Sequence, residues 1–332
     1  MGYNSQMIER ANAELSARRN NALVQRQNRI DEITAKLPQI AELRLELART
    51  GMKLARLISS RTPNIEVEVD KLQEQNLDNQ RRIAATLEAN GYPYDYLDLK
   101  ASCEKCGDHG IVGNRRCECF EKLLKRSASA ELSESAPITS CTFKNFDLSY
   151  YPDSLDSKLG IVAKEKMTDI FSYCKAYART FTSNSASIFM YGKTGLGKTH
   201  LSLAIAGEVV AKGYSVIYAS AQDILRKVER EHFGRGQADL DTLGTILSTD
   251  LLIIDDLGSE FESSFYISAV YNIINNRLNR RLPTIISSNL SSAELEKRYT
   301  DRVVSRLRSM YYNLCFVGND IRQIKAVKQM RG

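Results

Sequence analysis

The chain has 332 residues, which is enough for two domains with a buried core. Hydrophobic residues make up 43% and charged residues 26% of it, as in ordinary soluble proteins, and no apolar run has membrane-spanning length. The first residues lack the apolar core of a signal peptide, and Gln6 departs from the myristoylation pattern. We therefore expect a cytoplasmic protein that has no membrane partner.

The net charge of +6 is unevenly distributed along the chain. Residues 275–332 carry twelve Lys and Arg against four Asp and Glu, whereas residues 1–100 carry fifteen against fourteen. A solvated surface is the usual explanation of such a cluster. The phosphates of a nucleotide or of a nucleic acid would account for it equally well.

Residues 1–60 have a helical pattern, because they are rich in good helix formers and contain proline only at Pro38. Four apolar residues recur every seven positions: Ile33, Ile40, Leu47 and Leu54. Arg44 and Gly51 occupy the positions where further apolar partners would stand. The pattern therefore favours an amphipathic helix or a helical hairpin over a long coiled coil.

A break is expected at residues 61–64, and a second helix over residues 69–89, which Asn90 and Gly91 would end. Residues 1–100 contain no recognisable enzyme chemistry. They form either a partner-binding arm or a helical decoration packed on the main domain. We favour the arm, because so long a helical section precedes the α/β part of the chain.

Four of the seven cysteines lie close together in residues 101–126, in the pattern Cys103-x-x-Cys106 and Cys117-x-Cys119. Four thiolates suit a tetrahedral Zn²⁺ site, which would hold together a polar segment that has no core of its own. His109 could replace one thiolate. The alternative is a set of reduced cysteines without a metal.

Residues 127–140 are rich in Ser, Ala and Glu, which favours a flexible linker. The main domain is expected over residues 141–332, where helical stretches alternate with short apolar runs. The predicted strands are residues 187–191, 215–220, 251–255, 284–288 and 314–317. This alternation is typical of an α/β fold, here with a parallel five-stranded sheet covered by helices on both faces.

Residues 192–199 read Gly-Lys-Thr-Gly-Leu-Gly-Lys-Thr and lie between a predicted strand and a predicted helix. This is the phosphate-binding loop, in which glycines let backbone N–H groups converge on an anion. Lys198 would reach the β- and γ-phosphates of ATP, and the Thr199 hydroxyl would bind Mg²⁺. The candidate nucleotide-binding residues are Gly192, Thr194, Gly195, Leu196, Gly197, Lys198, Thr199 and His200.

Two later strands end in polar residues. Asp255 and Asp256 follow an apolar run, so Asp255 would hold Mg²⁺ and Asp256 would activate the attacking water. Asn289 ends the next strand and would position that water or contact the γ-phosphate. A turn-forming asparagine is the alternative for this last residue.

Three arginines near the end of the chain are candidates for phosphate contacts. Arg302 and Arg306 are four residues apart on one helical face and could reach a nucleotide in a neighbouring subunit. A basic, solvated helix face is the alternative. Arg322 begins a final helix and could contact the γ-phosphate of its own subunit.

With these residues assembled, the chain resembles AAA+ ATPases of the DnaC/DnaI helicase-loader family, close to the IstB transposition-helper ATPases. Residues 142–147, 192–199, 251–258, 287–289, 302–307 and 320–322 carry the resemblance. It implies that Asn289 is sensor 1, that Arg322 is sensor 2, and that Arg306, ahead of Arg302, is the arginine finger. It also implies that Ser263 and Phe265 face single-stranded DNA, where an aromatic ring suits base stacking.

The helical arm, residues 91–97 and the cysteine cluster resemble the N-terminal region of DnaI-type loaders. The resemblance thus implies an ATPase that uses ATP, Mg²⁺ and Zn²⁺, binds a hexameric replicative helicase, self-assembles through its ATPase domain and delivers the helicase onto single-stranded DNA. Asp256 replaces the Glu of many AAA+ proteins, so hydrolysis would be slow or partner-dependent. A transposase helper that binds duplex DNA and a non-catalytic adaptor are the alternatives.

Overall fold

The computed structural model describes residues 3–60, 65–133, 140–156, 160–234 and 241–331. The chain forms two compact units, one of residues 12–120 and one that combines residues 1–11 with residues 121–332. Within the described ranges, none of the helices combines the length and the apolar character needed to cross a membrane.

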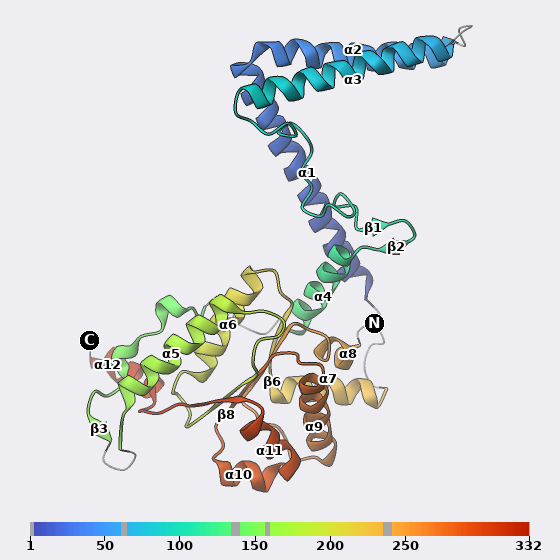
Figure 1. Cartoon of the computed structure of the whole chain (residues 1–332). Coiled ribbons are helices and arrows are strands. Elements are labelled where there is room, and N and C mark those ends of the chain that lie inside the picture. The colour runs from blue at the N-terminus through green and yellow to red at the C-terminus, as the bar shows by residue number, and fades with distance from the viewer. Residues whose placement is uncertain (1–2, 61–64, 134–139, 157–159, 235–240, 332) are drawn as a thin grey trace. The chain divides into compact units, whose positions relative to one another are not determined.

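The first unit is mainly helical, as the sequence predicts. It contains α1 (Ser5–Lys36, whose first residues belong to the other unit), α2 (Pro38–Ser60) and α3 (Ile65–Ala89). Helices α2 and α3 lie side by side as an antiparallel pair (Figure 1). Pro38 is tolerated because the first turn of a helix needs no hydrogen bond from its nitrogen.

Within residues 1–60, where the sequence favours an amphipathic helix or a hairpin, the structure has the two helices α1 and α2, and α2 pairs with α3, which includes the second helix predicted over residues 69–89. The buried positions of this pair include Leu43 and Thr50 on α2. They lie one residue before Arg44 and Gly51, the two positions at which the sevenfold pattern lacks an apolar partner. On α3 the buried positions include Leu72 and Asn79, and the Asn79 amide donates to Glu46 at 3.0 Å. The break expected at residues 61–64 lies outside the described residues.

The cysteine-bearing segment contains a short antiparallel hairpin of β1 (Ile111–Val112) and β2 (Arg115–Arg116), after which α4 (Glu118–Leu132) begins. Helix α4 therefore includes the first part of the expected linker, residues 127–140. That part is helical because Ala, Glu and Leu favour a helix and because Ala128 and Leu132 are buried on one of its faces. Residues 134–139 lie outside the described part of the chain.

The second unit is built on a parallel five-stranded sheet, which confirms the predicted α/β fold. Its strands are β5 (Ile188–Tyr191), β6 (Val216–Ser220), β7 (Leu251–Asp255), β8 (Thr284–Ser288) and β9 (Tyr312–Cys315). Their order in the sheet is β6-β7-β8-β5-β9. The last strand lies earlier than its apolar run predicts, because Tyr312 and Asn313 pair with β5.

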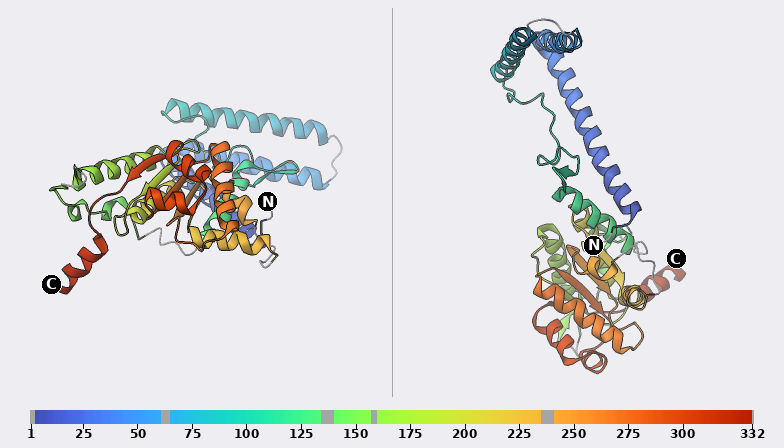
Figure 2. Two further views of the ribbon diagram at one scale, coloured as in Figure 1. Left: turned by 90° about the horizontal axis from the view of Figure 1, so that it is seen from below. Right: turned by 90° about the vertical axis from the view of Figure 1, so that its right-hand side faces the viewer.

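Helices cover both faces of this sheet (Figures 1 and 2). Side chains such as Ile253 pack with α5 (Ala163–Thr180) and α6 (Lys198–Ala211). Alternate side chains such as Ile254 pack with α7 (Ala221–His232), α9 (Ser264–Asn279) and α11 (Asp301–Ser309). The smaller elements are η1 (Phe143–Asn145), η2 (Leu148–Tyr150), β3 (Leu155–Asp156), β4 (Ile161–Val162), α8 (Thr242–Ile246), α10 (Ser292–Arg298) and α12 (Ile321–Arg331).

Candidate functional site

The predicted phosphate loop joins the carboxyl end of β5 to the start of α6. Gly197 is the residue before α6 and has φ of 92°, a left-handed conformation that glycine adopts without strain. Gly195 has φ of 76°, and a Cβ atom there would collide with the carboxylate of Asp320. Both glycines are therefore required by the backbone that this loop adopts.

Lys198 is buried, with 6% of its surface exposed, and its side chain lies beneath the loop. Its Nζ donates to the carbonyl oxygens of Gly192 at 2.6 Å and Lys193 at 2.7 Å, and to Oδ1 of Asn289 at 2.7 Å. Burial lowers the pKa of Lys198 to about 8, against the opposing charges of the neighbouring aspartates. The loop therefore holds a cation that a phosphate can stabilise.

Asp255 lies at the carboxyl end of β7, where its carboxylate accepts three hydrogen bonds. Thr199 Oγ1 donates to Oδ2 at 2.9 Å, and the Tyr218 hydroxyl donates to the same oxygen at 2.6 Å. Ser287 Oγ donates to Oδ1 at 2.5 Å. The hydroxyl and carboxylate expected to bind Mg²⁺ are thus in direct contact. No sequence pattern indicates a role for Tyr218 or Ser287, although Ser287 lies in the motif ending at Asn289.

Asp256 has φ of 58°, which is uncommon for a residue other than glycine. Its backbone N–H donates to Ser287 Oγ at 2.9 Å, and its carboxylate accepts from Nδ2 of Asn289. Asn289 therefore connects Asp256 to Lys198. The Asp256 carboxylate thus lies at the site, next to Asn289.

These residues surround a cavity of about 480 Å³, a volume in the range of small-molecule sites. The described residues that line it include those from Thr194 to His200, together with Asp255, Asp256, Ser287, Asn289 and Arg322. Of the other predicted loop residues, Gly192 holds Lys198 through its carbonyl oxygen. The first residues of the domain line another side of the cavity, among them Asn145 and Phe146, and Nε2 of His200 lies 2.9 Å from the carbonyl oxygen of Thr142.

The two candidate finger arginines lie elsewhere, on α11. Arg306 is not among the described residues that line the cavity. Its guanidinium donates to Oδ1 of Asn275 at 2.9 Å and lies over the ring of Tyr271 at 4.9 Å. Arg302 is exposed on the same helix. Neither arginine therefore contributes to the nucleotide cavity of its own chain.

The candidate DNA-facing residues lie at the start of α9. Ser263 precedes the helix, and its Oγ accepts from the backbone N–H of Phe265 at 3.2 Å. The ring of Phe265 is half-buried and lies 5.2 Å from the ring of His232 and 5.6 Å from that of Phe233. The structure thus adds two aromatic neighbours from the end of α7, one of them, Phe233, largely exposed.

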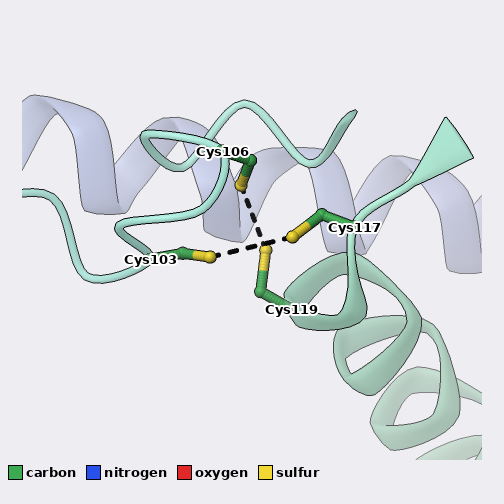
Figure 3. Close-up of side chains that lie close together, drawn as sticks. All are labelled: Cys103, Cys106, Cys117 and Cys119. Carbon is green, nitrogen blue, oxygen red and sulfur yellow. Dashed lines mark hydrogen bonds between the residues drawn. The ribbon is translucent and has the colours of Figure 1, made fainter. Parts of the chain in front are cut away.

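The four clustered cysteines point toward one another (Figure 3). Their Sγ atoms all lie within 4.8 Å, with Cys103 and Cys117 3.7 Å apart and Cys106 and Cys119 3.4 Å apart. Tetrahedral Zn²⁺ with bonds of about 2.3 Å separates its sulfur ligands by about 3.8 Å, so the donor set and spacing fit zinc. His109 is exposed and lies outside this cluster.

Further contacts shape the cysteine loop around that centre. The backbone N–H of Gly110 donates to Sγ of Cys106 at 3.3 Å. The buried carboxylate of Asp108 accepts from the N–H groups of Ser102 at 2.7 Å and Cys103 at 3.0 Å. Such bonds orient metal ligands before the ion binds.

Residues 174–307 match the family model described as IstB-like ATP binding protein. The chain is 26% identical over 202 residues to replicative helicase loader DnaC of Escherichia coli strain K12, which covers 60% of this chain and 77% of that protein. It is 25% identical over 232 residues to replicative helicase loader DnaI of Bacillus subtilis strain 168, covering 62% and 70%.

Among solved structures, the crystal structure of the DnaC helicase loader matches with a TM-score of 0.45 and 23% identity, covering 55% of this chain and 99% of that one. The residues matched by the family model include the phosphate loop and strands β5 to β8 of the sheet. Residues 174–307 therefore form a phosphate-loop domain similar to the IstB-like ATP binding proteins, and the curated relatives of the chain include the replicative helicase loaders DnaC and DnaI.

Proposed function

We propose that the protein is an ATP-dependent loader that binds a hexameric replicative DNA helicase and delivers it onto single-stranded DNA. The observation that carries the proposal is that five predicted site residues line one cavity and are connected by hydrogen bonds: Lys198, Thr199, Asp255, Asp256 and Asn289. These groups are the ones that ATP hydrolysis requires. The loader assignment rests in addition on the names of the curated relatives.

Each group has a role in the proposed ATPase cycle. The loop N–H groups and Lys198 bind the β- and γ-phosphates, and Thr199 and Asp255 hold Mg²⁺, which neutralises charge on the phosphate oxygens. Asp256, oriented by Asn289, positions the attacking water and accepts its proton. Arg322 contacts the γ-phosphate. The short Asp256 side chain makes hydrolysis slow until a partner adjusts the site.

Self-assembly is the second part of the proposal. Arg306, or Arg302 as the second choice, acts on ATP bound to a neighbouring subunit. The position of Arg306 outside its own cavity supports this role, because a finger that acts in trans faces the nucleotide of another subunit. Arg306 lies on α11, and its guanidinium contacts Tyr271 and Asn275 of α9.

The first unit, residues 12–120, would bind the helicase. Its four cysteines would hold a structural Zn²⁺ that keeps the polar segment folded. The paired helices α2 and α3 also expose large apolar side chains that a protein partner would cover. These exposed residues are Leu45, Met52, Val67 and Leu77.

Single-stranded DNA would lie at the start of α9, beside Ser263 and Phe265. The aromatic neighbours His232 and Phe233 support this placement, since stacked bases favour a surface of several rings. The curated relatives favour a loader over a transposase helper or a non-catalytic adaptor.

The purified protein tests the proposal in two assays. ATP hydrolysis is measured alone, with single-stranded DNA and with duplex DNA, and co-elution with the replicative helicase is measured by size-exclusion chromatography. We expect slow hydrolysis, a preference for single strands and a stable helicase complex. If the protein prefers duplex DNA and forms no complex with the helicase, the proposal that it is a loader is overturned. Full helicase delivery by Lys198→Ala would indicate the adaptor instead.

A further inference from the structure

The hydroxyl of Tyr218 contacts the carboxylate that is expected to serve Mg²⁺. It donates to Oδ2 of Asp255 at 2.6 Å, and both side chains are buried, with 8% and 9% of their surfaces exposed. Thr199 donates to the same oxygen at 2.9 Å. Tyr218 therefore holds the carboxylate oxygen that faces Thr199.

The sheet register explains how a tyrosine on a neighbouring strand reaches this position. Ser220 of β6 pairs with Asp255 of β7, and Tyr218 lies two residues earlier on the same face. Ile286 of β8 pairs with Ile254, which places Ser287 beside Asp255 from the other side. The carboxylate is thus held between two strands, with Ser287 on Oδ1 and Tyr218 on Oδ2.

Tyr218 acts only as a donor in this contact. Its phenol O–H is the donor and the carboxylate oxygen is the acceptor, because an ionised carboxylate has no proton to give. A hydrogen bond from a neutral donor to a carboxylate fixes the orientation of that carboxylate. A charged, oriented carboxylate is what a divalent cation requires.

We propose that Tyr218 is a positioning residue for Mg²⁺, which fixes Asp255 against Thr199 so that the cation binds together with ATP. This inference rests on the proposed ATPase function. Tyr218 does not line the cavity within the described part of the chain, so its effect reaches the cation only through Asp255. Loss of the hydroxyl should weaken the binding of the cation and leave the phosphate contacts of the loop intact.

The test compares Tyr218→Phe with wild type in the full-length protein. The dissociation constant of a fluorescent ATP analogue is measured with saturating Mg²⁺ and with EDTA. The ratio of the two values gives the gain in affinity that Mg²⁺ provides, called the gain from Mg²⁺. We expect Tyr218→Phe to reduce this gain about tenfold or more, as losses of such supporting contacts commonly do, and to leave the EDTA value unchanged.

Tyr177→Phe is the matched control. Tyr177 is equally buried, at 8% exposed, and its hydroxyl donates to the carbonyl oxygen of Ala186 at 2.8 Å, away from the cavity. It should keep the full gain from Mg²⁺, and its unfolding midpoint shows what the loss of a buried hydroxyl does to stability alone. An unchanged gain in Tyr218→Phe, or an equal loss in Tyr177→Phe, overturns the inference. A wild-type protein that binds no ATP analogue overturns the proposed function itself.

Discussion

The Nζ atom of Lys198 lies 2.7 Å from Oδ1 of Asn289, so the loop lysine and the end of β8 are in direct contact. The amide nitrogen of the same asparagine donates to the carboxylate of Asp256. A carboxamide can serve both partners because it carries a separate acceptor and donor. In the proposed cycle, a γ-phosphate bound beside Lys198 would therefore affect Asp256 through Asn289.

Replacing Asn289 should separate binding from hydrolysis. Asn289→Ala removes the donor that orients Asp256, and we expect kcat to fall by about 10²-fold while ATP binding changes little, because the loop contacts remain. Single-turnover hydrolysis and analogue binding are the two measurements. Asn276→Ala on α9 is the control, since Asn276 is half-buried, its side chain donates to the carbonyl oxygen of Asn272 on the same helix, and it is not among the described residues that line the cavity. Lost ATP binding with an unchanged kcat would contradict the role of Asn289.

Subunit mixing tests whether Arg306 acts on a neighbouring chain. Arg306→Ala should lower hydrolysis about 10³-fold without lowering ATP binding, as the loss of a finger does. Asp256→Asn should also be inactive, because it lacks the proposed base. A mixture of the two should regain activity, since an intact site of one variant then receives an intact arginine from the other.

Arg308→Ala is the control for that experiment, because Arg308 lies on α11 but pairs with Glu296 at the surface. It should retain normal hydrolysis. No recovery in the mixture, at protein concentrations where the wild type is active, would rule out a finger in trans. Loss of ATP binding by Arg306→Ala itself would instead indicate that Arg306 serves the fold.

The parts of the fold with strong local patterns were predictable. The phosphate loop carries its motif within residues 192–199, and the apolar runs that form β7 and β8 match the structure from first to last residue. The position of β9 was not predictable, because pairing with β5 and not hydrophobicity determines its register. The contact of Tyr218 with Asp255 was likewise not predictable from the sequence, because it depends on which strands are neighbours in the sheet.

The cysteine cluster supports a prediction about metal content. The purified protein should contain one Zn²⁺ per chain, and Cys106→Ser should lose it, because three sulfur ligands leave the tetrahedral site open. Metal analysis after gentle purification measures the ratio. The helicase complex should be lost with the metal, whereas ATP binding should persist.

His109→Ala is the control for the metal. The imidazole is exposed and stands apart from the four sulfur atoms, so this variant should keep its Zn²⁺. A variant that loses the metal would place His109 among the ligands after all. A wild-type protein with no bound metal would remove zinc from the proposal.

Arg277 has a role that no sequence pattern signals. It lies on α9, is completely buried, and donates to the carbonyl oxygens of Ile246, Thr249 and Pro283 and to Oγ1 of Thr284. Burial lowers its pKa to about 10, and four hydrogen bonds offset the loss of hydration. In the sequence it is one of several basic residues near the end of the chain, and only the packing distinguishes it.

Arg277→Met should therefore destabilise the second unit strongly. The methionine fills much of the volume but leaves three buried carbonyl oxygens without this donor, so we expect a loss of about 3 kcal/mol or more. Because the chain has no tryptophan, urea unfolding is followed by circular dichroism. Arg280→Ala, at an exposed position that contacts only the carbonyl oxygen of Leu247 at 3.1 Å, should change stability by less than about 0.5 kcal/mol. Equal effects of the two substitutions would show that the buried guanidinium contributes nothing beyond a surface arginine.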